Sequence, residues 1–175
     1  MEQKDSGIVQ KKGMSFIEIF ITLGILAVIS AVILLIVNPR RRKNDFFDLE
    51  RKNEIQALMD AISLCTFDNN GVLPQELESI PLDTYFVIGN NKSECDTVCN
   101  RAETQKECLR IQSGTCGDKG LLVPNYITKL PIDPDQKEWN EEKTGYYIGK
   151  ISSDTIKIGS CASIFESVEV SKKYK

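Results

Sequence analysis

Histidine is absent from this 175-residue sequence, and its absence excludes several kinds of catalytic site. Histidine is the side chain whose charge changes between pH 5 and 8, and it is the general base in Ser-His-Asp and Cys-His sites as well as the commonest metal ligand. Most familiar hydrolase mechanisms therefore have no base here. No constellation of carboxylates, lysines or metal ligands stands out as a substitute. We expect a protein that is not an enzyme.

A strong excess of charge of either sign is also missing, since the formal net charge is only −3. A nucleic-acid-binding surface normally carries a basic stripe, so no nucleic-acid partner is predicted. The one dense basic run, residues 40–43, directly follows a long apolar segment. This position is typical of the flank of a membrane helix.

The apolar residues are concentrated in one uncharged run, residues 19–37. At about 1.5 Å per residue this run would be roughly 29 Å long as a helix, close to the hydrocarbon thickness of about 30 Å. It ends in Asn38-Pro39 and arginines, whereas a secretory signal ends in small residues at a cut site. We expect a single membrane-crossing helix that is retained.

The string Gly13-Met14-Ser15-Phe16-Ile17-Glu18 immediately precedes this run. It resembles the processing site of type IV prepilins and type II secretion pseudopilins. In that family a prepilin peptidase cuts after the glycine and methylates the new amino terminus. The resemblance implies a leader of residues 1–13, cleavage between Gly13 and Met14, and N-methylation of Met14. Phenylalanine is the family's usual first mature residue and leucine its third, so Met14 and Phe16 are variants.

Glu18 is the fifth mature residue on this interpretation. A glutamate carried unpaired to mid-bilayer costs on the order of 2.5 to 3.5 kcal/mol, so such residues are functional by default. In the family this glutamate meets the amino terminus of a neighbouring subunit, and the apolar helix forms the filament core. The alternative is that Glu18 is only an interfacial flank. Ala27 and Ala31 are spaced for close approach of another helix, although small residues are common in single-pass helices.

Beyond Pro39, apolar residues recur at helical spacing and predict an amphipathic helix over residues 45–65. They are Ile55, Leu58, Met59, Ile62 and Cys65. Charged residues are assigned to the other faces of this helix: Arg51, Lys52, Glu54 and Asp60. Residues 68–71, Asp-Asn-Asn-Gly, predict its end, and Pro39 predicts a kink or a break in one long helix.

The rest of the chain predicts short strands separated by loops, with a hairpin turn at residues 152–154. The strands are expected at residues 84–88, 145–151, 155–162 and 164–170. Residues 89–120 form a polar insertion with one helical turn near residues 101–109. The expected fold is α+β and pilin-like: a long N-terminal helix, transmembrane and then amphipathic, packs on a small antiparallel sheet. The expected parts are residues 1–13, 14–38, 39–70 and a head of 71–175.

Six cysteines follow the apolar run, and an even number indicates disulfides formed outside the cytosol. The positive-inside rule, applied to residues 40–43, points the other way. We give the cysteines and the processing site more weight, and we predict an extracytoplasmic head. The missing C-x-x-C pair disfavours zinc. Fifteen pairings exist, and the expected one joins Cys65 to Cys161 and leaves four cysteines bridged within the insertion: Cys95, Cys99, Cys108 and Cys116.

Residues 68–74 and 126–134 resemble segments of the major pseudopilin of type II secretion, whose members bind calcium in a loop near the carboxyl end. Oxygen ligands are available there, but their spacing does not match an EF-hand, and acidic loop residues are usually just solvated. They are Asp133, Asp135, Glu138, Glu141 and Glu142. No cofactor is assigned.

We therefore expect a structural subunit of a type IV pilus or of a type II secretion-like filament. Its partners would be other pilins, the prepilin peptidase and the membrane. A DNA-uptake pilin is the first alternative, and the acidic balance of charge disfavours it. A single-pass receptor or enzyme domain is the second, and no catalytic constellation supports it.

Overall fold

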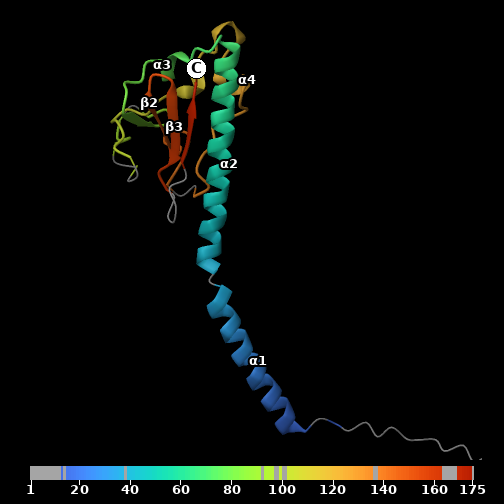
Figure 1. The fold of residues 1–175 in the computed structure, drawn as a ribbon. Helices are drawn as coiled ribbons and strands as arrows, with labels where there is room; N and C mark the ends of the chain where they lie inside the picture. Colours follow the sequence, from blue (N-terminus) through green and yellow to red (C-terminus); the bar gives the residue numbers. More distant parts are fainter. Residues whose placement is uncertain are drawn as a thin grey trace, which may run out of the picture. The chain divides into compact units, whose positions relative to one another are not determined.

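The computed structural model describes residues 13, 15–37, 39–91, 93–96, 99, 102–135, 138–162 and 169–174. The chain forms two compact units, one ending at Arg42 and the other comprising Lys43–Lys175. Figure 1 shows the helices of the chain and the small sheet of the second unit. Gly13 is the only residue of the predicted leader that is described. Residues 1–12, Met14 and Asn38 lie outside the described part.

The first unit contains α1, Phe16–Val37, which is apolar on all sides. Its described side chains are exposed, from Phe16 to Leu34 and at Ile36. A helix that is apolar all round needs an apolar surrounding, because no face of it is suited to water. The long apolar helix predicted from the sequence is confirmed.

The next helix, α2, spans Pro39–Asp68. Residue Asn38, between α1 and α2, lies outside the described part, so the predicted kink or break at Pro39 stays a prediction. Proline is favourable at a first helical position, where its missing N–H would have no partner anyway. At the other end Asn70 and Gly71 have positive φ angles of 56° and 86°. The amide of Gly71 donates a hydrogen bond to the carbonyl of Thr66 at 2.8 Å. The predicted helix end at residues 68–71 is confirmed, and its cause is this left-handed turn.

Four antiparallel strands form one sheet in the order β1-β2-β3-β4. They are β1 (Thr84–Val87), β2 (Tyr146–Ser152), β3 (Thr155–Ser160) and β4 (Glu169–Lys173). The first three and the turn after Ser152 agree with the prediction. The fourth runs to Lys173 and overlaps the predicted strand only at residues 169 and 170, while residues 163–168 lie outside the described part. The class is α+β.

The main core lies between α2 and one face of the sheet, which Figure 1 shows side by side. The apolar face of α2, including Ile55, Leu58 and Ile62, packs with Ile148 and Ile156 of the sheet. Each of these five side chains is at most 1% exposed. Each buried aliphatic side chain contributes about 1.5 to 3 kcal/mol, so this layer fixes the helix on the sheet.

A second core lies on the opposite face of the sheet and joins Tyr147, Trp139 and the disulfide of Cys99 and Cys161. Glycine makes room for aromatic rings on this face. A Cβ at Gly159 would lie 2.4 Å from the ring of Tyr147, which is its cross-strand partner in β2. Strand glycines of this kind mark a close approach of another group.

The insertion covers the outer edge of β1. Gln105 donates a backbone hydrogen bond to Tyr85 at 2.9 Å, and Leu109 donates one to Val87 at 2.8 Å. The predicted helical turn near residues 101–109 is therefore wrong for the described residues 102–109, which pair with the sheet instead. Short helical turns complete the unit: α3 (Gln75–Glu78), η1 (Ile111–Ser113), η2 (Gly117–Lys119) and α4 (Leu122–Asn125).

Three disulfides join Cys65 to Cys116, Cys95 to Cys108, and Cys99 to Cys161. The predicted Cys65–Cys161 bond is wrong. Cys65 belongs to the core under α2, whereas Cys161 belongs to the core on the other face, so the sheet separates them.

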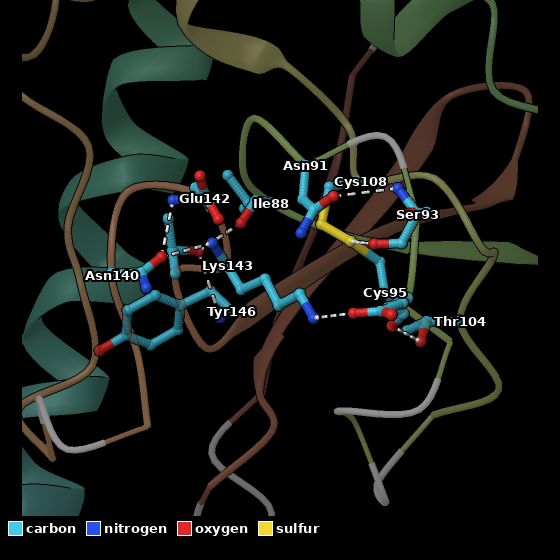
Figure 2. Close-up of a disulfide and its surroundings, with 12 residues drawn as sticks. Ile88, Asn91, Ser93, Cys95, Thr104, Cys108, Asn140, Glu142, Lys143 and Tyr146 are labelled. Carbon is cyan, nitrogen blue, oxygen red and sulfur yellow. Dashed lines mark hydrogen bonds and ion pairs between the residues drawn. A yellow bond between two sulfur atoms is a disulfide. The ribbon is translucent and has the colours of Figure 1, made fainter.

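Only one of the three bonds closes within the insertion, and the other two attach the insertion to α2 and to the end of β3. Figure 2 shows the internal bond, where Thr104 donates its hydroxyl to the carbonyl of Cys95 at 2.8 Å. Lys143 lies 3.6 Å from Glu94, which adds an ion pair between the insertion and the loop before β2.

Candidate functional site: the head of α1 and the outer face of α2

The first turn of α1 contains the only charged side chain of that helix, Glu18. Its carboxylate accepts a hydrogen bond from the backbone N–H of Ser15 at 2.8 Å. Ser15-x-x-Glu18 is the spacing of a capping box, in which the glutamate satisfies an amide that has no partner within the helix. A negative charge at a helix N-terminus is also favoured by the helix dipole. Both groups are exposed, so the carboxylate is accessible to an incoming partner.

The structure places Gly13 just before this turn, with its backbone exposed. A Cβ built on Gly13 would meet no atom within 4 Å. The second half of the predicted cleavage site, Met14, lies outside the described residues. Cleavage and methylation therefore stay predictions.

Hydroxyl groups in the apolar helix are satisfied within it. Thr22 donates to the carbonyl of Ile19 at 2.9 Å, and Ser30 donates to that of Leu26 at 2.7 Å. A hydroxyl that bonds the preceding turn presents no open donor to hydrocarbon, where an unsatisfied polar group is costly. α1 is long and apolar enough to cross a membrane, and its position near the amino terminus also fits a signal sequence.

Two exposed apolar pairs lie on the outer face of α2, opposite the core, and the exposed polar residues Asn53, Gln56 and Asp60 lie between them. The pairs are Phe46 with Leu49 and Leu64 with Phe67, with exposed fractions of 62%, 58%, 57% and 81%. At 100° per residue these four positions fall within about 60° of one another and about 120° to 180° from Ile55. We call them the outer stripe. Single exposed apolar residues are ordinary, but two pairs on one stripe indicate a surface that contacts something apolar.

A buried ion pair fixes α2 to the loop before β2. Arg51 Nε lies 2.7 Å from Asp133 Oδ2, and its Nη2 lies 2.9 Å from Oδ1, so the guanidinium binds both carboxylate oxygens. Arg51 is 2% exposed and Asp133 is fully buried. Asp48 accepts a third hydrogen bond at 2.6 Å. Burial by itself would lower the pKa of Arg51, but the hydrogen bonds to Asp133 and Asp48 outweigh it and raise that pKa above its ordinary value.

A second polar contact lies one turn further along α2, where the hydroxyl of Tyr146 donates to the carboxylate of Glu54. Burial raises the pKa of Tyr146, and the bond to Glu54 raises it further. Burial also raises the pKa of Glu54, against the opposite effect of the Tyr146 hydrogen bond. Together with Arg51, this contact determines where α2 lies along the sheet.

The acidic residues considered as calcium ligands are not brought together. Both oxygens of Asp133 are bound by Arg51, and the amide of Asp135 donates to the same carboxylate at 3.0 Å. Glu138, Glu141 and Glu142 are exposed. Within the described ranges, no group of three or more acidic or cysteine side chains is arranged to hold a metal ion. Asp133 thus has a cation already, supplied by the protein.

Sequence reasoning assigned Arg51 to a polar face of the helix, and this is wrong. The signal was present, because Arg51 lies four, seven and eleven residues before Ile55, Leu58 and Ile62, which places it on the apolar stripe. A charged residue in register with a core stripe requires a buried partner. The outer stripe is not predicted from the sequence either, because only two apolar pairs define it and the periodicity of the buried face is stronger.

Comparison with protein-family models, with curated proteins and with solved structures found no match to this chain.

Proposed function

We propose that this protein is a structural subunit of an extracytoplasmic filament of the type IV pilus or type II secretion class, processed by a prepilin peptidase between Gly13 and Met14. The observation that carries the proposal is the head of α1. A capped helix begins at Phe16, has one carboxylate in its first turn and is otherwise uncharged to Val37. The residues before it, from Gly13, resemble the prepilin cleavage site.

The role of Glu18 follows from charge balance in the filament. Cleavage before Met14 creates an amine that is mostly protonated at neutral pH. When helices pack together away from water, that ammonium requires an acidic partner, because an unpaired buried charge is strongly unfavourable. Glu18 of a neighbouring subunit supplies it, and the pairing favours one register of the packed helices.

The outer stripe of α2 supports an assembling subunit over a solitary anchored domain. In a domain that only projects from a membrane, no partner would cover the apolar residues exposed on this helix face, and they would contribute no favourable free energy of burial. They are Phe46, Leu49, Leu64 and Phe67. In a filament these side chains are covered by neighbouring helices. Their burial then contributes free energy to association at about 25 cal/mol per Å² of apolar surface.

Mass spectrometry of the protein purified from its own membrane tests the proposal. The expected mature chain begins at Met14 and carries one methyl group on its amino terminus. In a matched pair of leader variants, Gly13→Val should leave the leader attached, whereas Lys12→Gln should be processed normally. An intact Met1 in the wild-type protein, or a cut after Val37 as expected of a secretory signal, would contradict the proposal.

A further inference from the structure

The turn that ends α2 contains the only Asn-Gly pair of the sequence, Asn70-Gly71. In such a pair the side-chain carbonyl carbon of asparagine, Cγ, is within reach of the next backbone nitrogen, and glycine has no Cβ to obstruct the approach. Both residues are exposed, so water reaches them. The side chain of Asn70 makes no hydrogen bond with the described residues. The pair therefore has the composition and the access to water that spontaneous deamidation requires.

Deamidation of an Asn-Gly pair needs no enzyme and no reagent other than water. The Gly71 nitrogen loses its proton to hydroxide and attacks Cγ of Asn70. A bond forms between these two atoms, the bond from Cγ to the side-chain nitrogen breaks, and that nitrogen takes up a proton and leaves as ammonia. Water then opens the cyclic imide at either of its carbonyls, which gives aspartate or isoaspartate. No atom is oxidised or reduced.

In the folded chain the attacking nitrogen is already engaged. The N–H of Gly71 donates to the carbonyl of Thr66 at 2.8 Å, and the left-handed φ angles of Asn70 and Gly71 place it there. A hydrogen bond from the protonated amide makes the loss of its proton less favourable. Closing the imide ring also needs a ψ angle at Asn70 far from that of left-handed backbone. The attack therefore requires the turn to open.

Contacts with the insertion hold this turn closed. The Nδ2 of Asn69 donates to the carbonyl of Val72 at 3.0 Å, which closes the turn on itself. The side chain of Asn69 also packs on Gly117, where a Cβ would lie 2.5 Å from its Oδ1. Gly117 directly follows Cys116, which is bonded to Cys65, and the carbonyl of Cys65 accepts the amide of Asn69 at 3.0 Å. The disulfide thus fixes the insertion against the end of α2.

We propose that Asn70 is a latent deamidation site, protected while the end of α2 is closed and converted to aspartate and isoaspartate when that turn opens. The Cys65–Cys116 disulfide is the element that keeps the turn closed. The fold of Lys43–Lys175 alone carries this assignment, whatever the chain assembles into.

The products differ from asparagine in both shape and charge. Isoaspartate carries the backbone through the former side chain, which adds a carbon before Gly71 and moves the Gly71 amide out of register with Thr66. Either product adds a carboxylate to the groove of about 660 Å³ at the end of α2, whose described lining contains Lys172 and Lys173 and no carboxylate. Deamidation is irreversible, so it leaves a permanent record that the turn has opened.

Peptide mass spectrometry of the full-length chain in detergent, warmed at mildly alkaline pH, measures the conversion with time. Fragmentation of the peptide that contains residues 69–72 assigns the change from amide to acid to Asn70. A synthetic peptide of residues 66–74 has no fold and is the reference. We expect the folded chain to convert at least about ten-fold more slowly than this peptide, because only its open form reacts. Asn53, exposed on the same helix but followed by Glu54, is the internal control and should stay unmodified.

Disulfide variants identify what protects the site. Cys65→Ser with Cys116→Ser should convert Asn70 at least about ten-fold faster than the wild-type chain, because the open form becomes more populated. Cys95→Ser with Cys108→Ser removes the bond inside the insertion and is the matched control, which should convert at close to the wild-type rate. Circular dichroism shows whether each variant is folded. If either is not, the wild-type chain in urea below its unfolding transition replaces it, and conversion should rise in parallel with hydrogen exchange of the Gly71 amide.

Slow conversion in the folded chain, with fast conversion in the peptide and in the Cys65 and Cys116 variant, supports the proposal. A folded chain that converts as fast as the peptide, or a peptide that does not convert at Asn70, overturns it. Equal rates in the two folded disulfide variants, or conversion in urea that does not follow hydrogen exchange, would contradict the assigned role of the Cys65–Cys116 bond and of the turn.

Discussion

Glu18 is the residue on which the filament proposal makes its sharpest prediction. Glu18→Ala should insert into the membrane normally, because removing a carboxylate makes the helix more apolar. It should fail to assemble, since the Met14 ammonium of the neighbouring subunit would be buried unpaired at a cost of several kcal/mol. Glu18→Gln retains the hydrogen bond to Ser15 but not the charge, so it should be defective to a lesser degree. Filament yield in sheared fractions is the measurement.

The matched control is Ser30→Ala, which removes a hydroxyl that only bonds its own helix. It should assemble at the wild-type level. If Glu18→Ala also forms filaments normally, the interfacial-flank interpretation of this glutamate is correct.

The buried ion pair of Arg51 and Asp133 leads to a prediction about the stability of the fold. Arg51→Met leaves Asp133 buried without a cation and should lower the unfolding free energy by about 3 to 5 kcal/mol. The double variant Arg51→Met with Asp133→Leu should recover most of this loss, because an apolar pair of similar volume carries no desolvation penalty. Lys52→Met, which removes an exposed charge from the next position, is the control.

Urea unfolding of the full-length chain in detergent, followed by circular dichroism, measures all three variants. If the Arg51→Met variant is as stable as the Lys52→Met control, the ion pair does not hold α2 to the loop.

The raised pKa of Glu54 leads to a prediction about how the stability of the folded protein depends on pH. Burial raises the pKa of Glu54 in the folded protein above its value of 4.5 in the unfolded chain. Folding therefore favours the protonated form, and this contribution to stability is complete below about pH 4.5 and decreases as pH rises through the folded pKa. Glu54→Gln cannot ionise, so its melting temperature should not show this decrease. Thermal unfolding of both proteins between about pH 4 and pH 7 is the test, and parallel curves would contradict it.

At the scale of the elements, the next prediction concerns the disulfide that joins α2 to the insertion. Replacing Cys65 and Cys116 by serine opens a loop of 51 residues and should cost about 4 kcal/mol in the chain-entropy model. Replacing Cys95 and Cys108 opens a loop of 13 residues and should cost about 3 kcal/mol. Non-reducing peptide mapping should first show the three pairs described above. A peptide joining Cys65 to Cys161 would contradict the structure.

The elements also show which features of the fold can be predicted from sequence. α1, α2 and the first three strands are predictable, because their apolar residues repeat at the helix or strand period and turn residues bound them. The position of β4 cannot be predicted in the same way. Its last residues, Ser171-Lys172-Lys173, are exposed and polar, and only their pairing with β3 identifies them as part of a strand. Lysine suits an exposed edge, where it discourages pairing with other chains.

The disulfide pairing and the Arg51–Asp133 contact could not be predicted from the sequence, and the reason is the same for both. Each joins residues far apart in the chain, 51 residues for Cys65 and Cys116 and 82 for Arg51 and Asp133. Sequence periodicity reports which face of an element is buried, but it does not report what lies opposite that face. By contrast, residues 13–18 are a local pattern, and the roles that its resemblance to the prepilin processing site implies for Gly13, Met14 and Glu18 stay predictions.

For the whole molecule, the prediction concerns the side of the membrane on which the head lies. We expect Lys43–Lys175 outside the cytoplasm, because every cysteine in the structure is disulfide-bonded and such bonds persist in oxidising compartments. Thiol labelling of the full-length chain in cells should require prior reduction. Protease added to cells stripped of their outer layers should digest the head. Labelling without reduction, or protection from protease, would support the positive-inside rule instead.

The environment of Trp139 has a practical consequence, because it is the only tryptophan in the sequence. It is 7% exposed and belongs to the same cluster as the Cys99–Cys161 disulfide. An indole in an apolar cluster fluoresces at shorter wavelength than one in water, and a neighbouring disulfide quenches its emission. The natural chain therefore contains an optical reporter. The same cluster also includes the Cys95–Cys108 disulfide. Brighter emission at unchanged wavelength therefore signals reduction of a disulfide in this cluster, and a red shift signals that the cluster has opened, so the two events can be distinguished without any label.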